Sequence, residues 1–162
     1  MDKVKDKMVR MKNWDGEVME VEEAVASRSG LIRMIIMDMG THTTISLPEV
    51  STTILEKIIE YCRFHTLQDH VVALFWEISE EENWEEYMRA REEHDRRIDD
   101  LRKWDDEFVR KMDTTTLCKL VESCDYLDIS NLRNLASRCC GERITEKTMA
   151  LFNEGVCPSQ SE

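Results

Sequence analysis

The chain has 162 residues, of which 34 are acidic and 22 are basic, and its formal net charge is -12. This length and a hydrophobic content of 41 % suit one compact domain, or a small domain with a helical appendage. The acidic surplus argues against nucleic acid and anionic membranes as partners, because both select for clustered Lys and Arg. Protein partners are therefore the expected class.

The sequence predicts neither secretion nor membrane insertion. Its N-terminus lacks an apolar signal region, and no stretch approaches the roughly 18 uninterrupted apolar residues of a membrane span. Most cysteines occupy apolar helical positions without a Cys-x-x-Cys spacing, which indicates reduced thiols in a cytosolic or nuclear protein. The six are Cys62, Cys118, Cys124, Cys139, Cys140 and Cys157, and the last is expected to be exposed.

A β-hairpin is predicted at residues 8–21, which read MVRMKNWDGEVMEV. Two short extended runs flank Trp14, Asp15 and Gly16. The Asp-Gly pair favours a tight turn because Gly readily takes positive φ.

Two short helices and a strand are expected next. The helices follow Glu22 and are separated near Ser29 and Gly30, where the apolar pattern is interrupted. Residues 44–47 then predict a short strand, which ends at Pro48 because Pro cannot donate to a sheet ladder.

A longer helix is predicted after Ser51, which suits an N-cap position. Its apolar residues recur at three and four positions and define one buried stripe. They are Ile54, Leu55, Ile58, Ile59 and Cys62. Residues 8–66 are therefore expected to form a β-β-α-α-β-α unit.

Residues 67–97 are interpreted as an acidic linker or insertion. Between Glu77 and Glu107 there are 14 acidic and 6 basic residues, a net charge of -8 that is about two-thirds of the charge of the chain. Part of this segment also suits a helix. The segment also contains three consecutive apolar residues, Leu74, Phe75 and Trp76. Such a group is unusual for a linker and indicates either a helix that packs on a neighbour or a contact with a partner protein.

Residues 98–153 predict amphipathic helices that pack on one another. The first has an apolar face formed by Leu101, Trp104, Phe108 and Met112, which recur with helical spacing. Its charged residues, including Asp105 and Asp106, fall on other faces and are expected to be solvated.

Two more helices are expected, one capped by Asp113 and the next by Ser130. Each carries a helical apolar stripe. The stripe of the first comprises Leu117, Leu120, Val121, Cys124 and Leu127, and that of the second comprises Leu132, Leu135, Ala136 and Cys139.

Several segments in a fixed order resemble the S-phase kinase-associated protein family, the adaptors of SCF-type ubiquitin ligases. They are DGEVMEVEEAVA at 15–26, LPEVSTTILEKIIEYCRFH at 47–65 and WDDEFVRKMDTTTLCKLVESCDYLDISNL at 104–132, with an acidic spacer between the last two. The resemblance covers residues 8 to about 140. It implies an α+β architecture without catalysis: a BTB/POZ-type fold with a small three-stranded sheet at 8–66, and C-terminal helices at 98–153.

The same resemblance implies two protein partners. Family members hold a cullin through the BTB/POZ-type part and an F-box protein through the C-terminal helices. Tyr126, Asp125 and Pro48 are the cullin-contact candidates. The family commonly has Asn where this chain has Asp125, and the change adds a charge and removes an amide donor.

The F-box candidates are Leu132, Leu135 and Cys139, although a helix would bury the same side chains against its own core. Family members usually continue into two more helices that clasp the F-box. This chain instead ends with EKTMALFNEGVCPSQSE, so we expect a shortened C-terminal region and weakened F-box binding.

The sequence predicts no enzyme, metal site or cofactor. The successive carboxylates of residues 105–107 point in different directions along a helix and do not converge on a substrate. Cys62, His65 and His70 have a loosely metal-like order but lack a Cys-x-x-Cys pair, and no Gly-rich loop is present.

We therefore expect a noncatalytic SCF-type adaptor in the nucleus and cytoplasm. Two alternatives remain open. One is a homo-oligomeric BTB/POZ scaffold, and the other is a degenerate relative that binds cullin without recruiting an F-box protein.

Overall fold

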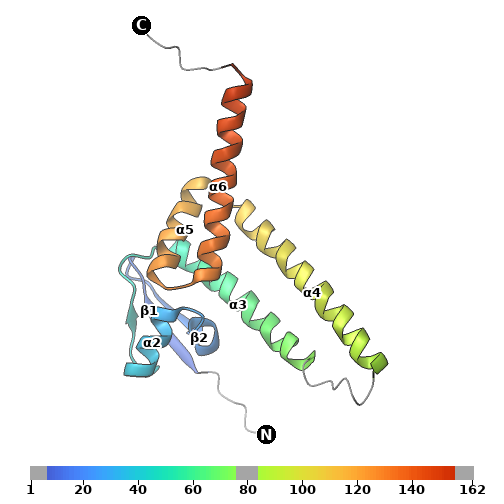
Figure 1. Ribbon diagram of the computed structural model, residues 1–162. Coiled ribbons are helices and arrows are strands. Elements are labelled where there is room, and N and C mark those ends of the chain that lie inside the picture. The colour runs from blue at the N-terminus through green and yellow to red at the C-terminus, as the bar shows by residue number, and fades with distance from the viewer. Residues whose placement is uncertain (1–6, 76–83, 156–162) are drawn as a thin grey trace.

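The computed structural model describes residues 7–75 and 84–155, and shows a small sheet with short helices, joined to four long helices (Figure 1). The elements in chain order are β1 (Met8–Lys12), β2 (Val18–Glu22), α1 (Glu23–Ala26), α2 (Gly30–Met39), β3 (Ile45–Ser46), α3 (Thr52–Phe75), α4 (Trp84–Arg110), α5 (Thr114–Tyr126) and α6 (Ser130–Asn153). The predicted α+β class and the β-β-α-α-β-α order are confirmed.

The sheet has the order β2-β1-β3, with β1 antiparallel to β2 and parallel to β3. Val9 pairs with Val21, and Met11 pairs with both Met19 and Ile45. Alternate residues of β1 are buried, as expected for a strand with one face on the core. The predicted hairpin and third strand are therefore confirmed.

The hairpin turn is fastened to the start of α3. The carboxylate of Asp15 accepts hydrogen bonds from the backbone N–H and the hydroxyl of Thr52, each at 2.7 Å. These bonds lower the pKa of Asp15. Ser51 stands at the predicted N-cap position, where its carbonyl accepts from the Leu55 N–H, but the side chain that satisfies the Thr52 N–H comes from the hairpin.

The acidic segment is helical wherever the structure describes it. The five predicted stripe residues of α3 are buried, and α3 continues to Phe75 before α4 begins at Trp84. In place of a wide apolar face, α4 carries ion pairs at helical spacing, each worth about 0.2–0.5 kcal/mol. They are Glu85–Arg89, Glu93–Arg97, Asp99–Arg102 and Asp100–Lys103. The apolar group Leu74–Trp76 lies outside the described side chains.

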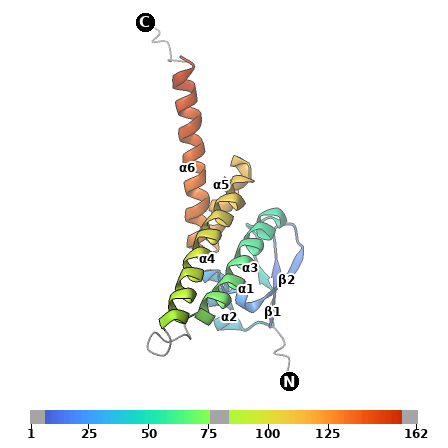
Figure 2. The same cartoon turned by 90° about the vertical axis from the view of Figure 1, so that its right-hand side faces the viewer.

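Aromatic rings hold α4 against α3, and the two helices lie side by side in Figures 1 and 2. The Trp104 ring stacks on Phe64 with 3.9 Å between centroids and on Phe108 with 5.0 Å. Phe108 and Met112 are buried, while Leu101 and Trp104 are partly buried. The predicted apolar face of this helix is confirmed.

The expectation that Asp105 and Asp106 are both solvated is wrong for Asp105. His65 of α3 is only 8 % exposed, and its Nε2 lies 2.7 Å from Oδ1 of Asp105. Asp105 follows Trp104 directly, so the ring stack brings its carboxylate to this histidine. Asp106 is exposed and accepts a hydrogen bond from Arg138 at 3.2 Å.

The helices α5 and α6 pack through their predicted stripes, of which only Val121 is less than fully buried. Asp113 takes the N-cap position of α5, although its side chain makes no capping hydrogen bond. The predicted cap at Ser130 is wrong, because Ser130 is already the first residue of α6 and Ile129 precedes it.

The turn between α5 and α6 docks on the first turn of α2. The Ser29 hydroxyl donates to the Leu127 carbonyl at 2.5 Å and accepts from the Ile32 N–H at 3.2 Å. The Gly30 N–H donates to the Asp128 carbonyl at 3.1 Å. The C-terminal helices therefore share one core with the sheet unit.

Replacing Trp104 with Ala should reduce the free energy of unfolding by on the order of 3 kcal/mol, because both ring stacks are lost and a void remains. Trp84→Ala on the same helix is the matched control, since Trp84 is 62 % exposed, and should cost less than about 1 kcal/mol. Urea denaturation measures both. Equal, small losses would show that the Trp104 stack does not hold α4 in place.

The two neighbouring aspartates should differ in the same assay. Asp105→Ala leaves the buried His65 without its partner and should cost about 1–3 kcal/mol. Asp106→Ala removes only an exposed ion pair and should cost less than about 1 kcal/mol. A larger loss for Asp106→Ala than for Asp105→Ala would contradict the role assigned to the histidine pair.

Candidate protein-binding surfaces

The residues with a metal-like order do not form a metal site. Cys62 is buried, and burial raises the pKa of its thiol to about 11. His65 is bonded to Asp105, and His70 is exposed. Within residues 7–75 and 84–155, no group of three or more His, Cys, Asp or Glu side chains is arranged to hold a metal ion. None of the described helices is sufficiently long and apolar to cross a membrane.

Tyr126 lies at a hollow where the hairpin, α3 and α5 meet. Tyr126 is the last residue of α5 and is 39 % exposed. The hollow has a volume of about 260 Å³. Its lining comprises Trp14, Glu49, Ser51, Ile54, Lys119, Glu122, Ser123 and Tyr126. Two aromatic side chains therefore share a surface with charges of both signs.

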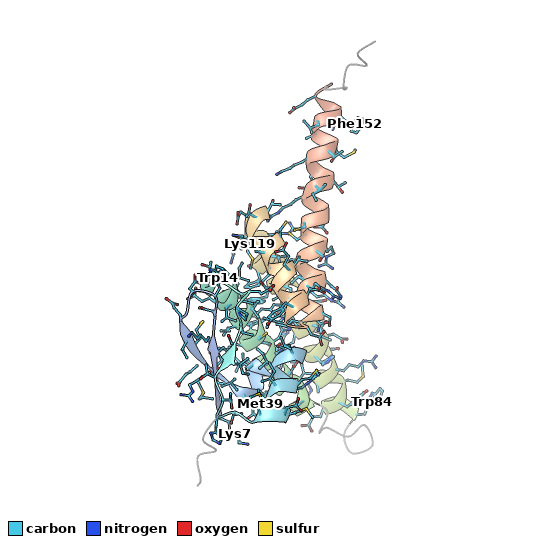
Figure 3. All side chains as sticks on the ribbon, turned by 90° about the vertical axis from the view of Figure 1, so that its left-hand side faces the viewer. Lys7, Trp14, Met39, Trp84, Lys119 and Phe152 are labelled. Atoms are coloured by element: carbon cyan, nitrogen blue, oxygen red, sulfur yellow. The ribbon has the colours of Figure 1, made fainter. Side chains whose placement is uncertain are left out.

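Trp14 is exposed but firmly held. Its side chain is exposed at the hairpin turn, where the residue is 71 % exposed, yet its backbone N–H donates to the Val50 carbonyl at 2.9 Å. The preceding residue, Asn13, is buried and donates to the Thr52 hydroxyl at 2.8 Å. Trp14 lines the hollow together with Lys119 of α5, and both residues are labelled in Figure 3. An exposed large aromatic side chain on an anchored backbone is typical of a contact site.

From the sequence, Trp14 is expected only as part of a turn. The sequence does contain a signal for Trp14. This residue lies out of phase with the alternation that buries Val9 and Met11, so its side chain is not expected in the core. Sequence alone did not indicate that this turn folds against α3 and beside α5.

The structure brings together only part of the predicted cullin set. Pro48 is exposed in the loop before α3, next to Glu49, which lines the hollow. The side chain of Asp125 accepts a hydrogen bond from Arg133 at 2.7 Å, across the turn between α5 and α6. Tyr126 is therefore the one member of the set that lines the hollow.

The three predicted F-box candidates lie in the core of the protein. Leu132, Leu135 and Cys139 are all buried on the face of α6 that packs inward. The structure therefore favours the alternative that these side chains stabilise the free chain. Their contact with an F-box protein stays a prediction.

The outer half of α6 exposes a different set of large apolar side chains. Residues Ile144, Met149, Leu151 and Phe152 are between 54 % and 69 % exposed. Ile144 and Leu151 are two helical turns apart, and Thr148 lies between them on the same face. Figure 3 shows Phe152 near the outer end of the helix, away from the body of the molecule. We call Ile144, Thr148, Leu151 and Phe152 the α6 apolar face.

Comparison with known proteins gives consistent matches. A family profile described as "Skp1 family, tetramerisation domain" matches residues 7–67. SKP1-like protein 3 of Arabidopsis thaliana is 36 % identical over 148 residues, which are 91 % of this chain and 82 % of that protein. The chain belongs to the Skp1 family.

Other Skp1-family proteins match over a similar length. SKP1-like protein 1 of Oryza sativa subsp. japonica is 37 % identical over 142 residues, covering 88 % of this chain and 78 % of that protein. The SCF ubiquitin ligase complex protein SKP1a of Dictyostelium discoideum is 30 % identical over 142 residues, covering 87 % and 77 %. The resemblance found in the sequence is confirmed.

The Skp1-family profile ends inside α3, so the two surfaces relate to it differently. The hollow combines matched residues, such as Trp14 and Ile54, with Tyr126 of α5. The α6 apolar face lies wholly beyond residue 67.

Proposed function

We propose that this protein is a noncatalytic adaptor that joins a cullin to an F-box protein in an SCF-type ubiquitin ligase, in the nucleus and cytoplasm. One relative is named as an SCF ubiquitin ligase complex protein. The proposal rests on one observation: this member of the Skp1 family has two separate exposed surfaces, the hollow at Tyr126 and the α6 apolar face.

The hollow is the proposed cullin surface. Its aromatic residues, Trp14 and Tyr126, belong to the types most often found among the residues that dominate binding energy. Glu49, Lys119 and Glu122 surround them with charges that help to select one partner and orientation. Trp14 lines the same hollow as Tyr126, which the sequence already indicated as a candidate.

The α6 apolar face is the proposed F-box surface. An amphipathic helix commonly binds a partner by laying its apolar side chains into a groove of that partner. The first half of α6 supports this role indirectly, because the burial of Leu132, Leu135 and Cys139 fixes it on the core.

The separation of the two surfaces supports a bridging role. Tyr126 lies at the end of α5, and α6 starts four residues later at Ser130. The rise of about 1.5 Å per residue puts Ile144 to Phe152 roughly 20–30 Å further along α6. Two partners at these positions need not compete for the same atoms.

A homo-oligomeric scaffold is the second candidate. The matched family profile is described as a tetramerisation domain, and α2 exposes Met34, Met37 and Met39. Exposed large apolar side chains can mark a site where a second copy of the chain binds. Light scattering of the purified chain separates the candidates, because the scaffold requires an oligomer in the absence of cullin.

Trp14→Ala and Tyr126→Ala should each weaken binding of a cullin N-terminal domain by about tenfold or more, because each removes an aromatic contact worth roughly 2 kcal/mol. Trp84→Ala, on a distant exposed Trp, should leave the affinity unchanged. Titration calorimetry measures all three. The adaptor proposal loses its support if the wild-type chain shows no cullin binding at micromolar concentrations.

Leu151→Glu should weaken binding of an F-box domain by roughly tenfold or more, because it buries a charge in the apolar contact. The matched control is Ala150→Glu, which adds the same charge to the neighbouring position, off the α6 apolar face. Circular dichroism checks that both variants fold. Equal affinities for the two variants would mean that this face does not hold the F-box.

A further inference from the structure

Cys118 of α5 and Cys140 of α6 lie at a similar level of the helix pair. The two helices run antiparallel on the same side of the turn at Asp128 and pack closely (Figure 1). Cys118 is ten residues before Asp128 and Cys140 is twelve after it, so their heights differ by about 3 Å. Each follows a buried residue, Leu117 or Cys139, and both therefore lie on the same flank of the interface.

The two thiols belong to neighbouring positions of this packed helix pair. Cys118 is exposed and Cys140 is partly exposed. Partial burial and the neighbouring Cys118 thiol raise the pKa of Cys140. The expectation that Cys157 is exposed concerns a residue outside the described ranges. Among the described cysteines, Cys118 is exposed.

The remaining described cysteines are shielded. Cys62, Cys124 and Cys139 are buried in the core. Burial raises the pKa of Cys62 to about 11 and that of Cys124 to about 12, so both thiols stay protonated at neutral pH. A thiol of this kind is inert toward oxidants because the thiolate is the reacting form.

We propose that Cys118 and Cys140 form an oxidisable dithiol, which a hydroperoxide converts to a disulfide between α5 and α6. The Cys118 thiolate attacks one peroxide oxygen, an S–O bond forms, the O–O bond breaks and the departing oxygen leaves as water. Cys140 then attacks the Cys118 sulfur and displaces the second oxygen, which leaves as water with the Cys140 proton. Two thiols lose two electrons and two protons, and hydrogen peroxide is reduced to two waters.

The disulfide would tether α6 to α5 at one defined point. Cys140 lies one helical turn before Ile144, so the bond fixes α6 just before its outer half begins. The α6 apolar face stays uncovered. Closing the loop from 118 to 140 also restricts the unfolded chain, and the oxidised protein should be more stable for that reason.

The test treats the full chain, carrying Cys157→Ser to remove the C-terminal thiol, with hydrogen peroxide and maps disulfides by mass spectrometry without reduction. The expected product is a monomer that has lost two hydrogens and contains a Cys118–Cys140 cross-link. Cys62, Cys124 and Cys139 should react with an alkylating reagent only after denaturation. No cross-link, a cross-link through Cys139 or intermolecular dimers alone would overturn the proposal.

Two single variants separate the steps. Cys140→Ser should leave a Cys118 sulfenic acid that dimedone traps, whereas Cys118→Ser should give neither adduct nor cross-link. Thermal unfolding gives a second readout: peroxide should raise the midpoint of the Cys157→Ser chain and leave that of the Cys118→Ser variant unchanged. Equal shifts in the two proteins would contradict the tether.

Discussion

The carbonyl oxygen of Leu127 joins the two halves of the protein. It is buried and accepts hydrogen bonds from the Ser29 hydroxyl at 2.5 Å and the Leu31 N–H at 3.3 Å. A buried carbonyl left without donors would cost about 1–3 kcal/mol, so this contact fixes the turn between α5 and α6 on the first turn of α2. At Gly30 a Cβ atom would lie 2.1 Å from the Asp128 carboxylate, and glycine permits the close approach.

The positions of both candidate surfaces follow from that junction. Tyr126 directly precedes Leu127, so docking the turn also places the tyrosine beside the hairpin, where Asp15 and Thr52 hold Trp14. The same turn sets the start of α6 and hence the direction of its outer half. On the other side of the body, the Trp104 stack and the His65–Asp105 pair fix α4 on α3.

Periodic patterns predicted the fold well because burial on one face is a local property of a helix or strand. The Asp-Gly turn, the α3 stripe and the Trp104 face could be found in this way. The pattern did not show what each face packs against: Asp105 pairs with a histidine forty residues earlier, and Leu132 is buried in the core instead of meeting solvent. The charge density of residues 67–97 did not reveal how the segment folds, since ion pairs along α4 support a helix there.

As an adaptor, one chain must hold two partners at the same time, through surfaces fixed on one core. The most direct measurement is the molar mass, by light scattering after size exclusion, of an equimolar mixture of this protein, a cullin N-terminal domain and an F-box domain. The account predicts a single particle with the summed mass of one copy of each. Separate binary complexes, in which the F-box domain displaces the cullin domain, would contradict it.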